Sequence, residues 1–347
     1  MIGRKFAQEM ATSVDRKSTT RFYSILVIAN VMLWLWAAVE FRGNTVGIGL
    51  ALTAFGLGLR HAFDADHIAA IDNATRKLIR AGRGVIGVGF FFALGHSLVV
   101  LIAATGIALG ARSVSLNHPE LKEFGCDVAS VASFTFLLLI GLSNVALLKD
   151  SLRCRRIEKA EGDCAEPANL QPAGYLMRAL FPFFTLVEKS WHMALVGAVF
   201  GLGFDTATEI ALLSLSAGQA ADGVAINNIL IFPALFGGAM TLADSTDGVL
   251  MNYAYRWSID RSGGVAFYNT GITALSICVA MVIGLGEALS FVSRKFSLTS
   301  GPWDAINRFN ENLNLVGFLV VAVFAVGWAV SAGRYRMKQR QVLVRRA

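Results

Sequence analysis

Charged residues are scarce in this sequence, and their scarcity excludes an ordinary water-soluble domain. Asp, Glu, Lys and Arg make up 16% of the 347 residues, hydrophobic residues make up 55%, and the mean hydropathy is +0.56. Soluble domains carry about 25% charged residues. The apolar residues fall in blocks as long as the roughly 20 residues that a helix needs to cross a bilayer. Because the short alternating segments of membrane β-barrels are missing, we predict an all-α polytopic membrane protein.

Several chemical motifs are also missing, and each absence removes a class of function. The four cysteines are not closely paired, which disfavours a thiolate metal site. The sequence has neither a P-loop for ATP nor the His-Glu-x-x-His motif of an intramembrane zinc protease. Its five histidines are too few for the several histidine boxes of a desaturase. We expect no cleavable signal peptide, because the first apolar run is long enough to stay in the membrane.

The Lys and Arg residues sort by side of the membrane. With the N-terminus inside, the cytoplasmic segments carry 23 of them and the opposite segments carry 6. Cytoplasmic loops are enriched in Lys and Arg, so we expect both termini in the cytoplasm and a cytoplasmic loop at 149–180. The net charge of +7 is then a topology signal and not a sign of nucleic-acid binding. In one transmembrane domain over 1–347, about eight spans are predicted: 23–41, 46–71, 84–110, 126–148, 191–216, 227–251, 266–292 and 313–332.

The second predicted span ends in a cluster of polar residues, RHAFDADHIAAID at 60–72, after fourteen uncharged residues. At 100° per residue in a helix, His61, Asp64 and His67 share an arc of about 120°. Asp66 falls on the far side of His61 by the same count. One straight helix therefore cannot direct all four side chains at a single ion. Either Asp66 acts outside the ligand set, or the helix is irregular here.

Carboxylates at membrane depth make a purely structural interpretation unfavourable. Each acidic residue at a helix centre costs about 2.5–3.5 kcal/mol on insertion scales. Six of them would cost of order 15–20 kcal/mol, which exceeds a typical folding stability of roughly 5–15 kcal/mol. They must face one another, water or a cation, and Arg60 is the only well-placed positive partner. The six are Asp64, Asp66, Asp205, Glu209, Asp244 and Asp247.

Histidines add nitrogen donors to these carboxylates. His61 and His67 lie in the second span, and His96 lies in the third. A mixed nitrogen and oxygen site suits Ni²⁺, Co²⁺ or Zn²⁺, whereas Mg²⁺ and Ca²⁺ prefer oxygen alone. Other interpretations stay open, since His67 could reach the interface and His96 could bond a carbonyl of another helix. Asp205 could cap a broken helix, and Asp247 could lie at a helix end.

A short motif occurs in both halves of the sequence. FGLG at 55–58 in span two is repeated at 200–203 in span five, and acidic residues follow each copy. Four shared residues could arise by chance. If they mark a repeat, spans 1–3 and 4–6 run in opposite directions, because three helices separate the copies, and two further helices follow. Such an inverted 3+3 repeat is typical of transporters that bind substrate near the midplane.

Four motifs together resemble the nickel/cobalt transporter family: RHAFDADHI, FFALGHS, GLGFDTATE and ADSTDG, in spans two, three, five and six. The family signature His-x₄-Asp-His corresponds to His61, Asp66 and His67. The chain departs from the family pattern in reading HMALVG before the glycines of span five, where Tyr-Pro is frequent, and in carrying Ser245 where Thr is usual. The resemblance implies an eight-helix permease of the cell (inner) membrane that takes up Ni²⁺ or Co²⁺.

We therefore predict a secondary permease and not an enzyme. Ni²⁺ or Co²⁺ would be the transported substrate rather than a cofactor, and we expect no obligatory protein partner. The carboxylates of span five would receive the ion from outside, and those of span six would release it inside. Export of the same ions and a membrane-embedded His/Asp metalloenzyme are the alternatives. The candidate metal-binding residues are His61, Asp64, Asp66, His67, His96, Asp205, Glu209, Asp244 and Asp247.

Overall fold

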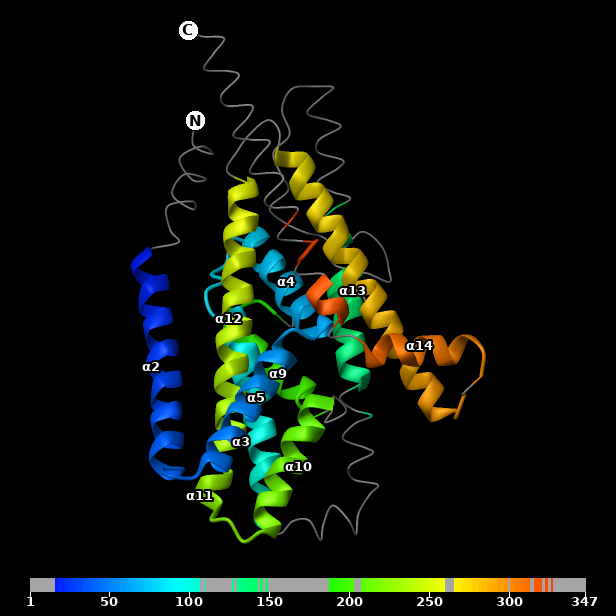
Figure 1. Cartoon of the computed structure of the whole chain (residues 1–347). Coiled ribbons are helices and arrows are strands. Elements are labelled where there is room, and N and C mark those ends of the chain that lie inside the picture. Colours follow the sequence, from blue (N-terminus) through cyan, green and yellow to red (C-terminus); the bar gives the residue numbers. More distant parts are fainter. Residues whose placement is uncertain are drawn as a thin grey trace, which may run out of the picture.

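The computed structural model contains helices and no strand in the part of the chain that it describes, which confirms the all-α fold class there (Figure 1). The predicted loop 149–180, Asp205 and both termini lie outside the described residues. The structure describes residues 16–106, 109, 127, 130–142, 144, 145, 148, 187–202, 207–259, 265–298, 300–312, 315–319, 322, 323 and 326.

Within these ranges, four helices are long and apolar enough to cross a membrane, and the chain is a helical membrane protein. They match the predicted first, third, sixth and seventh spans. The short helix α11 (Ile226–Ile229) leads directly into the third of them. The four are α2 (Arg16–Glu40), α5 (Val88–Gly106), α12 (Ile231–Ile259) and α13 (Val265–Lys295).

The fourth, fifth and eighth predicted spans are described only in part. Residues 130–142 form a short apolar helix. A second one comprises η2 (Ser190–His192) and α9 (Met193–Phe200), and α10 (Ala207–Ala221) follows it. Residues 315–319 are helical as well. The count of eight spans and the inverted repeat therefore stay predictions.

Span two is not the single helix over 46–71 that hydropathy predicts. It consists of α3 (Thr45–Ala62) and α4 (Ala65–Arg80), which are bent by 54°. The break has a local cause, because Asp64 adopts the extended conformation (φ −65, ψ 140) that precedes a helix and that Asp favours at the N-cap. The second half also continues nine residues past the predicted end, from 71 to 80.

Close backbone contacts hold α12 against the two helices that carry the histidines. A Cβ atom at Gly58 of α3 would collide with the backbone of Phe236, and one at Gly89 of α5 would collide with the backbone of Asp244. Small residues allow membrane helices to approach in this way, so that van der Waals contacts and side-chain hydrogen bonds form between them. Both contacts place α12 beside the break in span two, where the polar residues lie.

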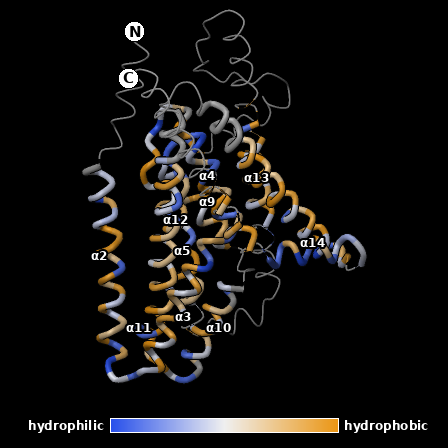
Figure 2. The backbone as a smooth tube through the Cα atoms, turned by 45° about the horizontal axis from the view of Figure 1, so that its top comes forward, coloured by the Kyte–Doolittle hydropathy of each residue, from blue (hydrophilic) through white to orange (hydrophobic). Residues whose placement is uncertain are grey.

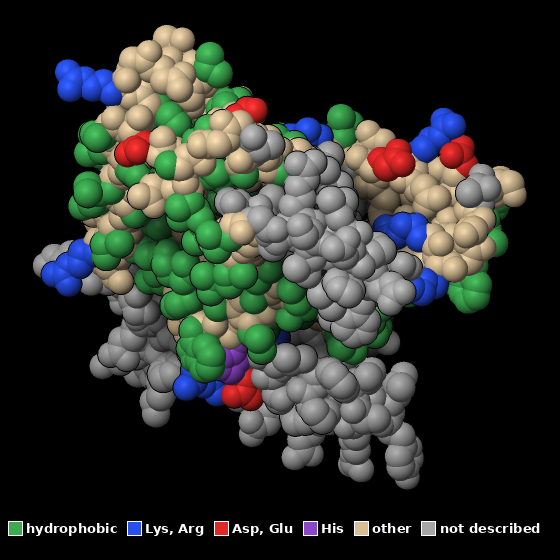
Figure 3. Space-filling view, turned by 90° about the horizontal axis from the view of Figure 1, so that it is seen from below, with side chains coloured by type: hydrophobic (Ala, Val, Ile, Leu, Met, Phe, Trp, Pro, Cys, Tyr) green, Lys and Arg blue, Asp and Glu red, His purple; other side chains and the backbone are tan. Residues whose placement is uncertain are grey.

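The outer surface of the bundle is apolar, as a lipid-facing surface requires. On α2, the side chains of Ile25, Ile28 and Met32 are 66%, 62% and 61% exposed. Figure 2 shows hydrophobic stretches along α2, α12 and α13. The amphipathic α14 (Pro302–Glu311) projects to one side and carries hydrophilic stretches. The end where α3 begins faces the viewer in Figure 3, where hydrophobic side chains gather over the middle of the molecule and charged ones lie around its edge.

Candidate metal centre

The polar cluster of span two lies at the break between α3 and α4. His61 is in the last turn of α3, Asp64 is the N-cap of α4, and Asp66 and His67 lie in the first turn of α4. The helix is therefore irregular here, which was one of the two options that the helical spacing left open. The break brings the two imidazoles together, with ring centroids 4.6 Å apart.

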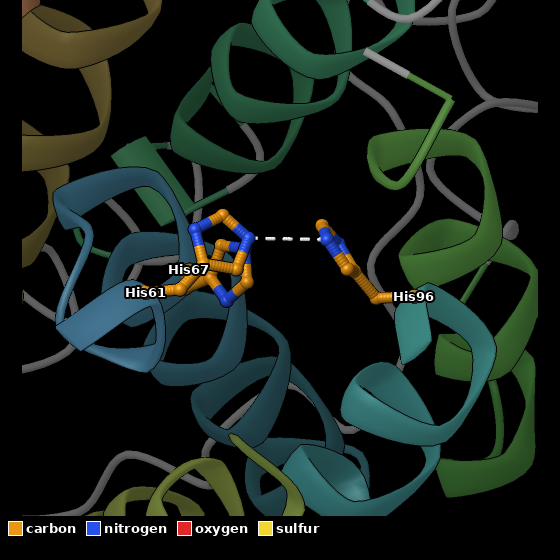
Figure 4. Close-up of side chains that lie close together, drawn as sticks. All are labelled: His61, His67 and His96. Carbon is orange, nitrogen blue, oxygen red and sulfur yellow. Dashed lines mark hydrogen bonds between the residues drawn. The ribbon is translucent and has the colours of Figure 1, made fainter. Parts of the chain in front are cut away.

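A third imidazole reaches the same place from α5. The side chains of His61, His67 and His96 are each at most 2% exposed. One nitrogen of each ring lies within 4.8 Å of the others, and Figure 4 shows the rings from α3, α4 and α5 meeting in one space. A hydrogen bond of 3.1 Å joins His61 Nε2 and His96 Nε2. The structure thus brings the three predicted histidines together.

Glu209, from the first turn of α10, adds a carboxylate oxygen to this group. Its Oε1 atom lies 2.9 Å from His96 Nε2 and 3.8 Å from His61 Nε2. Together with the 3.1 Å between the two nitrogens, these distances define a triangle of donor atoms. A point equidistant from the three atoms lies about 1.9 Å from each, close to the 2.0–2.2 Å of metal bonds to imidazole and carboxylate. A transition-metal ion therefore fits among these atoms with little movement.

The opposite nitrogen of His61 is held by two residues. Asp64 Oδ2 lies 2.8 Å from His61 Nδ1, and the Thr208 hydroxyl lies 3.1 Å from the same atom. Metal-binding histidines characteristically donate their second ring N–H to a carboxylate or another acceptor, which fixes the tautomer and the ring orientation. Asp64 is placed to do this for His61, so that Nε2 faces the donor triangle.

Several buried polar atoms in the cluster lack a hydrogen-bond partner within the described part of the chain. They include Nδ1 of His67, Nδ1 of His96 and both carboxylate oxygens of Asp244. Asp244 Oδ2 lies 3.6 Å from His67 Nδ1, which is beyond hydrogen-bond distance. Buried polar groups are normally satisfied, and these atoms keep the capacity to bind an ion or a water. Imidazole and carboxylate donors together suit Ni²⁺, Co²⁺ or Zn²⁺.

Aromatic rings surround the imidazoles. Phe92 contacts His67 edge to face, with ring centroids 4.8 Å apart, and Phe236 lies 5.5 Å from His61. Phe200 packs against Phe92, with ring centroids 5.3 Å apart. These rings keep the cluster away from bulk water, so that charges inside it interact strongly. A cation that entered would exchange its hydration shell for protein donors.

The remaining predicted residues lie around this centre or outside the described part. Asp66 is half-buried, and its Oδ1 atom accepts the backbone N–H of His67 at 2.9 Å. Asp247 lies one turn beyond Asp244 on α12, is half-buried and has a buried Oδ2 atom. Asp205 is not among the described residues. Arg60, expected to be the positive partner of the carboxylates, is exposed.

Sequence reasoning missed two features. Thr208 contacts His61, 147 residues away, and no local pattern reveals this contact. Arg76 lies beyond the predicted end of span two at 71, but in the structure it belongs to α4, is 2% exposed and pairs with Asp72. A spacing of four residues between opposite charges was the available signal for that pair.

Comparisons with known proteins agree with a metal-transport role. A family model described as high-affinity nickel-transport protein matches residues 47–333. A high-affinity nickel transport protein of Cupriavidus necator is 40% identical over 95% of both chains. A hydrogenase nickel incorporation protein of Bradyrhizobium diazoefficiens is 44% identical over 90% of this chain and 82% of its own. A cobalt transport protein of Rhodococcus rhodochrous is 34% identical over 91% and 92%. No solved structure matches.

Proposed function

Because this chain belongs to the family of high-affinity nickel-transport proteins, we propose that it imports Ni²⁺ or Co²⁺ through the centre formed by α3, α4, α5 and α10. It is a permease for these ions and not an enzyme, since the family and its relatives are transport proteins. The ion is its transported substrate.

The ion is bound, in this proposal, by His61 Nε2, His96 Nε2 and Glu209 Oε1, with His67 supplying a further nitrogen. The observation that carries the proposal is the triangle of donor atoms, with edges of 2.9, 3.1 and 3.8 Å. An ion among these atoms would replace the hydrogen bonds that now join them. It would also offset the cost of keeping two imidazoles and a carboxylate away from water.

Nearby carboxylates orient the ligands rather than bind the ion directly. Asp64 holds His61 through Nδ1, and Asp244 faces Nδ1 of His67. Asp66 fixes the backbone at His67. Groups in these positions usually change metal affinity about 10- to 100-fold when they are mutated. The nitrogen-rich donor set favours Ni²⁺ over Co²⁺, in the general order of affinities for divalent ions.

The proposed route crosses the membrane beside the break between α3 and α4. In this proposal the carboxylates of span five receive the ion from outside, with Glu209 as a ligand of the centre, and Asp244 and Asp247 lead it inward along α12. The termini are cytoplasmic, the protein lies in the cell membrane, and the halves form an inverted repeat. Lys and Arg support this orientation, because they are concentrated in the segments assigned to the cytoplasm.

The deciding experiment is uptake of radioactive nickel by cells that carry the His61→Ala variant. Saturable uptake should be lost while the amount of protein in the membrane stays unchanged, because one corner of the donor triangle is removed. The matched control is His192→Ala, which changes a half-buried histidine in η2, outside the cluster. Wild-type uptake in the His61 variant would refute the site. Faster loss of nickel from preloaded cells that carry the wild-type protein would identify an exporter.

A further inference from the structure

A second buried polar group lies in α4, beyond the histidine cluster. The Arg76 Nε atom lies 2.9 and 3.0 Å from the two carboxylate oxygens of Asp72. Both side chains are 2% exposed. The Ser276 hydroxyl of α13 donates a third hydrogen bond to Asp72 Oδ2. The carboxylate of Asp72 is therefore held by a cation from its own helix and a hydroxyl from another.

This pair stands at the inner end of the proposed route. α4 and α12 pack together and run toward the same end of the bundle (Figure 1). Asp72 lies five residues after His67, about 7 Å further along the axis of α4. Gly248 of α12 packs near Ile71, which places the neighbouring Asp247 beside this part of α4. The route therefore passes from the histidines toward the pair.

Two carboxylates of α12 lie along this path before it reaches Asp72. Asp244 comes first, 3.6 Å from His67. Asp247 is next, about one turn further along α12, and its neighbour Gly248 packs near Ile71 of α4. Both oxygens of Asp244 and Oδ2 of Asp247 are buried without a hydrogen-bond partner among the described residues. Such unsatisfied oxygens suit a path that a cation or water occupies in turn.

A role in folding alone explains the pair poorly. Replacing a buried ion pair by apolar residues of similar volume is often neutral or stabilising, because both charges must be removed from water. The pair is thus weak evidence for stability. Its position near Asp244 and Asp247 gives the pair a different consequence, since Arg76 is a buried cation that lowers the net negative charge at this end.

We propose that Arg76, acting through Asp72, balances the charge of Asp244 and Asp247, so that a divalent ion passing them is released and not retained. Asp72 and Arg76 are then positioning residues of the exit. With the guanidinium present, the carboxylates attract the ion out of the histidine site but do not trap it. The inference rests on the inward route of the proposed function.

The test is nickel uptake by the purified protein in lipid vesicles, with KM and Vmax measured separately. Slow release lowers both values together, so Arg76→Gln should lower KM and Vmax each about threefold or more. Asp72→Asn leaves the guanidinium unbalanced, and it should raise KM while lowering Vmax. The double variant restores the balance, and its KM should return to within about twofold of the wild type. A merely structural role would lower Vmax through loss of protein and leave KM unchanged.

Two controls separate position from charge. Arg76→Lys keeps the positive charge, and its KM should stay close to that of the wild type. Lys77→Gln removes one positive charge from the adjacent position and should leave KM unchanged. The proposal would be overturned if Arg76→Gln and Asp72→Asn both had the KM of the wild type. It would also be overturned if the two variants shifted KM in the same direction.

Ser276→Ala keeps the inference testable if the charge variants do not fold. It removes one donor from Asp72 and leaves both charges in place, so KM and Vmax should fall together by about twofold. Ser290→Ala is the matched control, because its hydroxyl bonds Asn307 of α14 instead. Unchanged kinetics in Ser276→Ala would refute the inference. The proposed function would survive that result, since it fails only if the His61 variant transports normally.

Discussion

Replacing Asp64 by Asn should weaken Ni²⁺ binding about tenfold without disturbing the fold. The carboxylate lies 2.8 Å from His61 Nδ1, and the two side chains are 4% and 1% exposed. Hydrogen bonds to a charged group contribute about 1.5–3 kcal/mol, against about 0.5–1.5 kcal/mol for neutral ones. An Asn oxygen can still accept the N–H, so the variant loses only the difference. A loss of about 1.4 kcal/mol corresponds to a tenfold change in affinity.

Equilibrium binding of radioactive nickel to the detergent-purified protein measures this change directly. Thr208→Val removes the weaker, neutral hydrogen bond of 3.1 Å to the same nitrogen. It should therefore lower the affinity for Ni²⁺ by a smaller factor than Asp64→Asn does. Asp304→Asn, on the exposed side of α14, is the matched control and should bind like the wild type. If Asp64→Asn binds within about twofold of the wild type, the carboxylate does not hold the imidazole and the reasoning fails.

Three further predictions test the packing and the donor set. Glu209→Gln should weaken Ni²⁺ binding by at least about tenfold, because the ion loses a negatively charged ligand. Undiminished Ni²⁺ binding in equilibrium dialysis would exclude Glu209 as a ligand. Gly89→Ala should lower the thermal midpoint of the purified protein, since its Cβ would collide with the backbone of Asp244. Gly49→Ala, whose Cβ meets no described atom within 4 Å, is the control, and equal midpoints for the two would contradict the close packing. Phe92→Ala should cost about 3–5 kcal/mol of unfolding free energy because the ring is fully buried, and a loss below about 1 kcal/mol would show that the site tolerates a cavity.

The sequence contains enough information to predict which residues meet, but not how they meet. His61, His67 and His96 were predicted from their chemistry, since imidazoles at membrane depth need a partner. The break at Asp64 was foreseen only as one of two options, because helical spacing shows that a straight helix fails without showing where it bends. Glu209 depends on the placement of α10 against α3, a contact between distant parts of the chain that no local pattern specifies.

The end of span two shows why the hydropathy count ended the helix before Arg76. A hydropathy count treats Asp72 and Arg76 as two charges, so it ends the span before them and assigns Arg76 to the cytoplasmic loop. In the structure the two charges offset each other at 2.9 Å, and α4 continues to Arg80. This part of α4 can stay buried despite two charged residues because Asp72 and Arg76 neutralise each other. The same pairing makes the region sensitive to a third charge, since a divalent ion near Asp247 would compete with Arg76 for Asp72. A buried ion pair beside a cation path is thus better understood as part of the path than as a fold-stabilising contact.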